Sequence, residues 1–325
     1  MASAWETARS SIQSKLDALM ERITEAQDAG EPVSLSWLNS ERRYRELIEQ
    51  VDTELASLTE TILPKITEAQ SDGIALSVDA AKQLTVSALG PAPEGVEVAW
   101  NRLPKATVEA LVGYASDGSP LRVLLDEFGL DASRQIRGVL IAGVSRGAGA
   151  MQMTRELKTL VGDGKDPGNL KGRAETIVRT EFHRASRAAQ LDSYGQNADL
   201  FEGWVWTAAL DGRTCTSCWA MHGTLHPLTE MLDDHPNGRC VMTPRTKSWD
   251  ELTGEGGYED TRPTIEDGSA RFARLTPERQ KEVLGAGLYD LYAAGKVSLP
   301  ELVRQYSNPR WGTMRRPATL KEVTG

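Results

Sequence analysis

Apolar residues recur at helical intervals over the first sixty positions. One stripe, spaced by seven, four, three and four positions, comprises Trp5, Ile12, Leu16, Leu19 and Ile23. A second stripe comprises Tyr44, Leu47, Ile48, Val51, Leu55, Leu58 and Ile62. The connection between them is short, and Gly30 and Pro32 end the first helix. Short connections favour antiparallel neighbours, so the pattern predicts a helical hairpin, with Pro64 kinking or stopping its second helix.

The helical pattern continues in shorter pieces. It predicts a helix from Val78 to about Leu89 and a linker rich in proline and glycine from Gly90. Three amphipathic pieces are expected next, beginning at Lys105, Pro120 and Ser133. A flexible loop is predicted from Gly162, and a long helix from about Arg173 to Tyr194.

After Gly195 the pattern changes. The segment "GWVWTAALDG" is rich in residues that suit a strand and ends in an Asp-Gly turn, and "RCVMTP" predicts a returning strand. A helix is expected to start at Thr276 and end at Gly295. Ser298 and Glu301 form the capping box of one more short helix.

The predicted fold is mostly α-helical and α+β overall. It has an N-terminal antiparallel helical hairpin, a helical middle and a small α+β C-terminal domain. A chain of 325 residues is long enough for about two domains. We divide it into an N-terminal helical region at 1–89, a helical middle region at 90–172 and a C-terminal domain at 173–325.

Composition excludes several classes of protein. The chain is 40% hydrophobic and 26% charged, and no apolar run approaches the roughly 18 residues of a membrane-spanning helix. The first residues lack an apolar signal region, so a cytoplasmic protein is expected. In a reducing compartment, three cysteines favour a metal site or free thiols over disulfides.

Charge is distributed unevenly. The net charge of −9 argues against a protein that coats nucleic acid with its whole surface. Residues 1–60 carry 12 acidic and 6 basic side chains, net −6, whereas residues 134–187 carry 11 basic and 5 acidic ones, net +6. Either the two segments meet different partners or helical surfaces vary in charge by chance. The candidates for contact with DNA are Arg134, Arg137, Arg146, Arg155 and Lys158.

All three cysteines and three of the four histidines lie between positions 211 and 240. A C-x₂-C pair, Cys215 and Cys218, is followed by the H-x₄-C pair of His235 and Cys240. Structural zinc sites take four such ligands from two neighbouring segments. The spacing therefore predicts a closed Cys₃His zinc site, in which His222 or His226 is the alternative to His235.

Catalytic zinc motifs are absent from the sequence. No histidine has a glutamate two residues later, as a zinc deaminase requires, and there is no H-E-x-x-H. A zinc-supported nuclease that acts on DNA and uses His222 and His226 remains the alternative function. Trp204, Trp206 and Trp219 flank the cluster and are expected to pack over it.

Three segments resemble the phage head-morphogenesis proteins of the Mu F type, also called minor head or minor capsid proteins. They are "RAETIVRTEFHRASRAAQ", "WVWTAALDGRTCTSCWAMHGTLHPL" and "HPNGRCVMTP". The matching residues are Arg179, Thr180, Glu181, Trp206, Asp211, Arg213, Thr214, Cys215, Cys218, Gly223, His235, Pro236, Arg239 and Cys240. The resemblance covers roughly 173–244, with the metal knuckle at 211–244. The chain departs from the pattern at Gly238, where many members have a cysteine.

The resemblance implies a structural virion protein and not an enzyme. Its expected place is inside the head near the portal vertex, and in the host cytoplasm during assembly. It would act in procapsid assembly, genome packaging or ejection. The implied partners are the portal protein, the major capsid or scaffold protein and packaged DNA, with no membrane.

Overall fold

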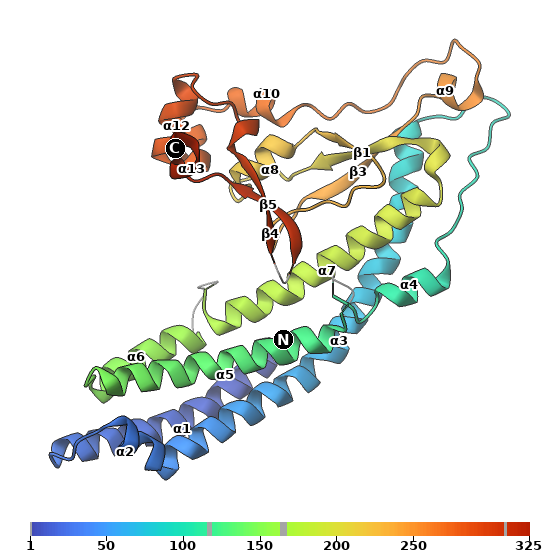
Figure 1. Cartoon of the computed structure of the whole chain (residues 1–325). Helices are drawn as coiled ribbons and strands as arrows, with labels where there is room; N and C mark the ends of the chain where they lie inside the picture. Colours follow the sequence, from blue (N-terminus) through green and yellow to red (C-terminus); the bar gives the residue numbers. More distant parts are fainter. Residues whose placement is uncertain (1, 116–118, 163–167, 309–310) are drawn as a thin grey trace. The chain divides into compact units, whose positions relative to one another are not determined.

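The computed structural model describes residues 2–115, 119–162, 168–308 and 311–325. The chain forms two compact units. Figure 1 labels helices and strands of the chain. The first unit comprises Met1–Ala69 and Gly113–Arg179, and the second comprises Gln70–Val112 and Thr180–Gly325. The three-way division predicted from the sequence stays a prediction.

The first unit is built from helices. They are α1 (Ala2–Asp28), α2 (Leu35–Ser40), the first part of α3 (Arg42–Leu89), α5 (Leu121–Ser145), α6 (Ala150–Val161) and the first part of α7 (Leu170–Gly195). Ion pairs and hydrogen bonds between α1 and α3 join Ser11 to Gln50, Lys15 to Glu46 and Ala18 to Arg43. Successive residues along α1 thus contact residues progressively earlier in α3, which means that the two helices are antiparallel. The predicted hairpin is confirmed.

Two local predictions for these helices differ from the structure. Of the two outcomes expected at Pro64, a stop does not occur, because α3 continues through it with Ile62 and Ile66 buried on either side. Their packing compensates for the hydrogen bond that a proline removes, a loss of about 3 kcal/mol. The pieces expected from Pro120 and Ser133 form the single helix α5, whose buried face runs unbroken through Phe128, Ala132 and Ile136.

The linker after Gly90 is confirmed, since no helix or strand is formed between Gly90 and Pro104. The loop expected from Gly162 falls largely on 163–167, which lie outside the described residues. α7 begins at Leu170, three residues before the predicted start.

The second unit combines short helices with two small sheets. It contains the second parts of α3 and α7, α4 (Lys105–Leu111), η1 (Ala198–Leu200), β1 (Phe201–Thr207), α8 (Thr216–Met221), β2 (Leu225–His226), β3 (Val241–Thr246), α9 (Trp249–Thr253), α10 (Gly268–Ala273), α11 (Pro277–Leu284), α12 (Ala286–Ala293), η2 (Pro300–Leu302), β4 (Val303–Asn308), β5 (Gly312–Pro317) and α13 (Leu320–Thr324). β1 is the central strand of an antiparallel sheet of order β2-β1-β3. The two predicted strands are therefore confirmed, and the fold is mostly helical and α+β.

The core of the second unit lies beside this sheet. Trp204 and Trp206 of β1 are almost fully buried and pack in one cluster with Cys218 and Cys240. Trp219 belongs to a second cluster, with Phe272. The first two tryptophans thus pack next to the cysteines as expected, and their burial leaves no face for a nucleic-acid base.

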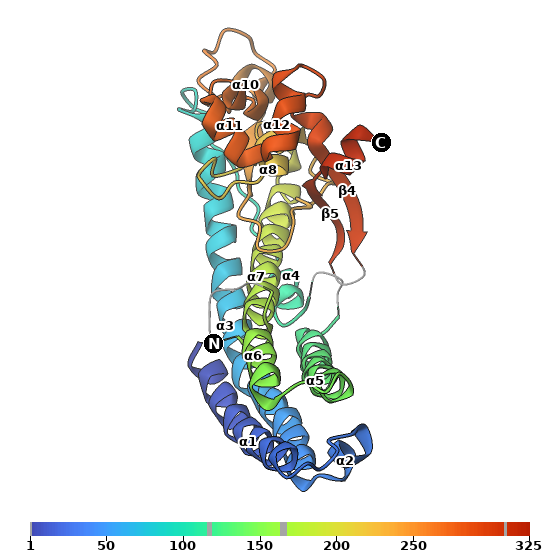
Figure 2. The same cartoon turned by 90° about the vertical axis from the view of Figure 1, so that its left-hand side faces the viewer.

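The C-terminal part differs from the prediction in two places. The helix expected up to Gly295 is broken at Gly285, whose φ of 74° and ψ of 160° end α11. The carboxylate of Glu301 accepts from the backbone and hydroxyl of Ser298 as predicted, but Glu301 lies in the 3₁₀ turn η2 and not in an α-helix. The hairpin of β4 and β5 was not foreseen, because its strands are short and largely polar. Figure 2 shows this hairpin and α13 from the side.

None of the helices in the described residues is both long and apolar enough to cross a membrane.

Candidate metal centre

The two thiols of the C-x₂-C pair are presented by the start of α8. Cys215 is the N-cap residue and Cys218 lies in the first turn. A local turn sets up this start, because Asp211 Oδ1 accepts hydrogen bonds from Arg213 N at 3.0 Å and Thr214 Oγ1 at 3.1 Å. Short polar side chains of this kind close turns against their own backbone. The turn formed by the Asp-x-Arg-Thr-Cys sequence therefore positions Cys215 at the start of α8.

The facing segment is the loop 234–240, which leads into β3. Asn237 has a φ of 61°, a left-handed conformation that asparagine tolerates better than most residues. Its backbone N–H donates to Thr180 Oγ1 of α7 at 3.1 Å, and Gly238 N donates to His235 O at 2.9 Å. This turn brings His235 and Cys240 back toward α8.

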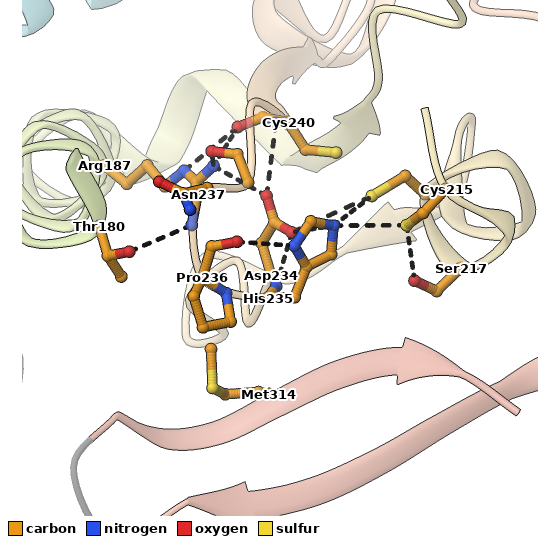
Figure 3. A network of polar contacts seen from close by, with 12 residues as sticks. Thr180, Arg187, Cys215, Ser217, Asp234, His235, Pro236, Asn237, Cys240 and Met314 are labelled. Carbon is orange, nitrogen blue, oxygen red and sulfur yellow. Dashed lines mark hydrogen bonds and ion pairs between the residues drawn. The ribbon is translucent and has the colours of Figure 1, made fainter. Parts of the chain in front are cut away.

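His235 points its ring at both thiols of α8 (Figure 3). Nε2 lies 3.3 Å from Cys215 Sγ and 3.6 Å from Cys218 Sγ. Nδ1 lies 2.9 Å from the backbone oxygen of Pro236, which can only accept a hydrogen bond. Nδ1 therefore carries a proton, and Nε2 faces the sulfurs, as in histidine ligands whose other nitrogen is held by a carbonyl.

The potential ligand atoms form two overlapping groups in the described part of the chain. One group is Cys215, Cys218 and His235, and the other is Cys218, Asp234 and Cys240. Within each group the ligand atoms lie within 4.8 Å of one another. The structure thus brings all four predicted ligands together and adds Asp234, which the sequence analysis did not consider. Which of them bind the ion stays a prediction.

The electrostatics of this cluster suit a divalent cation. A hydrogen bond from Cys218, aided by His235, lowers the pKa of Cys215 to about 3. The neighbouring thiols Cys215 and Cys240, together with burial, raise the pKa of Cys218 above its usual range. The hydrogen bond to Cys215 raises the pKa of His235 to about 9. Sulfurs this close compete for one proton, and a bound Zn²⁺ removes the conflict by taking both as thiolates.

Arg187 of α7 is hydrogen-bonded to three residues of the loop 234–240. Its guanidinium donates to Asp234 Oδ2 at 3.0 Å, to Gly238 O at 3.0 Å and to Cys240 O at 2.6 Å. The side chains of Arg187 and Asp234 are only 9% and 1% exposed. The sequence analysis missed both residues. The neighbours of Arg187 at helical spacing are His183, Arg184, Gln190 and Leu191, so nothing in the pattern sets this arginine apart.

A second, half-exposed ion pair joins the two halves of the motif. The Arg239 guanidinium donates two parallel hydrogen bonds to Asp211, at 2.8 and 2.7 Å. These bonds hold the pKa of Asp211 well below its usual range. The loop 234–240 is therefore tied to the turn before α8 by charge as well as by the cysteines.

The two alternative histidines are engaged elsewhere. His222 is buried, which lowers its pKa, and its Nδ1 accepts a hydrogen bond from Ala208 N at 3.0 Å. His226 stacks on Trp204 with the ring centroids 4.4 Å apart, and its ring nitrogens contact Thr224 and Glu230. Neither ring belongs to either ligand group found in the described residues.

Replacing His222 and His226 together with alanine is expected to leave the metal content unchanged. The variant loses the acceptor for the buried Ala208 N–H, which costs about 1–3 kcal/mol of unfolding free energy. Metal analysis of the purified variant and its thermal unfolding curve test this expectation. Loss of metal with little loss of stability would instead assign the histidines to the metal site.

The five basic residues considered for DNA contact all lie on α5, α6 or the turn between them, in the first unit. Arg137 pairs with Asp52 at 2.7 Å and Arg146 pairs with Glu156 at 3.0 Å. The exposed side chains that remain are Arg134, Arg155 and Lys158.

A family model described as phage Mu protein F like protein matches residues 134–243, about a third of the chain. The match begins in α5 and ends in β3, so it contains the whole cluster with Arg187 and Asp234. This region belongs to the phage Mu F-like family. The family is one of structural phage head-morphogenesis proteins, which confirms the resemblance seen in the sequence. No curated protein and no solved structure matches the chain.

Proposed function

We propose that the chain is a minor head protein of a tailed bacteriophage that acts at or near the portal, inside the head. Its work would be in procapsid assembly, genome packaging or ejection, and its place during assembly would be the host cytoplasm. The observation that carries the proposal is the family match over 134–243, which includes the complete cysteine–histidine cluster.

The cluster supports a structural role for the metal. The residues present fit Zn²⁺, since soft sulfur ligands and one imidazole converge from two segments. Cys215, Cys218 and His235 would hold the ion, with Cys240 as the fourth ligand predicted from the sequence. Four protein ligands leave no position for a catalytic water. Zinc would then join α8 to the loop before β3, in a small sheet domain that needs such a staple.

The nuclease alternative gains no support from the site geometry. The histidines that it requires, His222 and His226, are held by Ala208 N and by Trp204 and Glu230 respectively. An assay of the metal-loaded protein with double-stranded and single-stranded DNA would show no cleavage under this proposal.

The proposed partners are the portal protein and, more broadly, the major capsid or scaffold protein. The acidic segment 1–60 offers a surface for protein contacts. Arg134, Arg155 and Lys158 are the exposed candidates for packaged DNA once the paired Arg137 and Arg146 are set aside. Two of the five candidates for that contact are neutralised, so the DNA contact would be local and would weaken with added salt.

Co-expression with the portal protein of the same phage tests the proposal. We expect a complex that survives size-exclusion chromatography, and the chain among the proteins of purified virions. The matched control is the Cys215→Ser/Cys218→Ser variant, which tests whether the complex needs an intact metal centre. Absence of the chain from virions together with no portal complex would contradict the proposal.

A further inference from the structure

Asp234 is a buried carboxylate whose two oxygens face different neighbours. Oδ2 accepts from Arg187 at 3.0 Å and from Cys240 N at 3.4 Å. Oδ1 accepts from His235 N at 2.6 Å and lies 4.0 Å from Cys218 Sγ. One oxygen is thus fixed by the arginine, and the other is turned toward the thiols.

The spacing around His235 fits a four-coordinate ion that includes this oxygen. Nε2 lies 3.3 Å from Cys215 Sγ, 3.6 Å from Cys218 Sγ and 3.6 Å from Asp234 Oδ1. A tetrahedral zinc with nitrogen and oxygen at about 2.0 Å and sulfur at about 2.3 Å places neighbouring ligand atoms about 3.5 Å apart. Cys240 Sγ groups with Cys218 and Asp234 within 4.8 Å.

Resting on the metal site proposed above, we propose that Asp234 Oδ1 is the fourth protein ligand, with Cys215, Cys218 and His235. Cys240 lies beside the ion without binding it. The assignment replaces the Cys₃His set predicted from the spacing by a Cys₂HisAsp set.

Charge balance supports this choice. Two thiolates and the carboxylate carry three negative charges, which Zn²⁺ and the guanidinium of Arg187 cancel. A third thiolate at Cys240 would leave one excess negative charge in a site where Cys218, Asp234 and Cys240 are all buried. Uncompensated charge in such a place is costly.

Position 238 shows that the loop is built around this carboxylate. A Cβ added to Gly238 would lie 1.8 Å from Asp234 Oδ2 and 2.2 Å from Oδ1. The oxygens cannot move aside without losing Arg187 and the backbone N–H groups of His235 and Cys240. A side chain at position 238 and the Asp234 carboxylate therefore cannot occupy this space together. Because position 238 is a glycine, the carboxylate can stay beside the thiols, where it can bind the ion.

Absorption spectroscopy of the full chain loaded with Co²⁺ tests the ligand set, because the intensity of sulfur-to-cobalt charge transfer reports the number of bound thiolates. We expect Cys240→Ser to keep the full intensity. Asp234→Asn should shift the ligand-field bands and lower Co²⁺ affinity.

A loss of about one third of the intensity in Cys240→Ser, with unchanged ligand-field bands in Asp234→Asn, would overturn the proposal. Asp233→Asn is the matched control for the loss of a carboxylate from this loop, since Asp233 pairs with Arg315 and belongs to neither ligand group found in the described residues, and it should keep the wild-type spectrum. Absence of Co²⁺ binding by the wild-type chain would refute the metal site itself and is distinct from either ligand result.

Gly238→Ala provides a second test with an intact ligand set. The new methyl group should displace the carboxylate and lower Co²⁺ affinity by about 10–100-fold or more, the range typical of losing a supporting contact at a metal site. The matched control is Gly256→Ala, where no atom lies within 4 Å of the added Cβ. Equal affinities in the two variants would contradict a role for Asp234 at the metal.

Discussion

Replacement of Cys218 with serine is expected to abolish metal binding and to destabilise the second unit more than any other single change at the cluster. Cys218 is the only residue shared by both ligand groups in the described part of the chain. Its side chain also packs with Trp204 and Trp206, so loss of the ion is coupled to the core beside β1. Structural zinc contributes about 10–16 kcal/mol of apparent binding energy in small domains, and one lost ligand removes much of it.

The measurement is metal content together with thermal unfolding followed by tryptophan fluorescence. Ser217→Ala is the matched control, since Ser217 lies in the same helix turn and contacts Cys215 Sγ at 3.1 Å without belonging to a ligand group. We expect Ser217→Ala to keep the metal. A Cys218→Ser protein with wild-type metal content and melting temperature would contradict the structural role.

Replacement of Arg187 with methionine is expected to cost about 3–5 kcal/mol of unfolding free energy, the usual result of leaving one partner of a buried ion pair alone. Asp234 would lose its guanidinium, and the carbonyls of Gly238 and Cys240 would lose a donor. Chemical denaturation of the metal-loaded protein measures the change.

An exposed ion pair in the first unit provides the control for this prediction. Arg122 and Glu60 in the first unit are joined by two short hydrogen bonds, but both side chains are about half exposed. Arg122→Met should change the unfolding free energy by less than about 1 kcal/mol. Similar losses of unfolding free energy in Arg187→Met and Arg122→Met would show that burial of the Arg187–Asp234 pair does not increase its contribution to stability.

The sequence predicted the features that depend on periodicity and spacing. The apolar stripes located the hairpin of α1 and α3, and the C-x₂-C and H-x₄-C spacings located the cysteine–histidine cluster. Helix breaks were predicted less well. Pro64 is tolerated because its neighbours are buried, whereas Gly285 ends a helix whose apolar face continues beyond it. Packing at Pro64 and a local backbone angle at Gly285 determine whether the helix continues, and the periodicity of apolar residues reports neither.

The residues that support the site were hidden for a different reason. Arg187 lies 47 positions before its partner Asp234, and only the fold joins them. Asp234 precedes His235 in an acidic stretch, and acidic stretches are usually exposed to solvent. Its burial could therefore not be predicted from composition. Gly238 is informative only once the position of the neighbouring carboxylate is known. Pairing between distant segments is a property of tertiary structure.

The central claim is that the cluster holds a closed, structural metal ion. X-ray absorption at the zinc edge of the purified full-length chain tests it most directly. We predict one zinc per chain with four protein ligands, a sulfur shell at about 2.3 Å and a nitrogen and oxygen shell at about 2.0 Å. A chain that is folded without zinc, or a zinc with a coordinated water in an open position, would contradict the account.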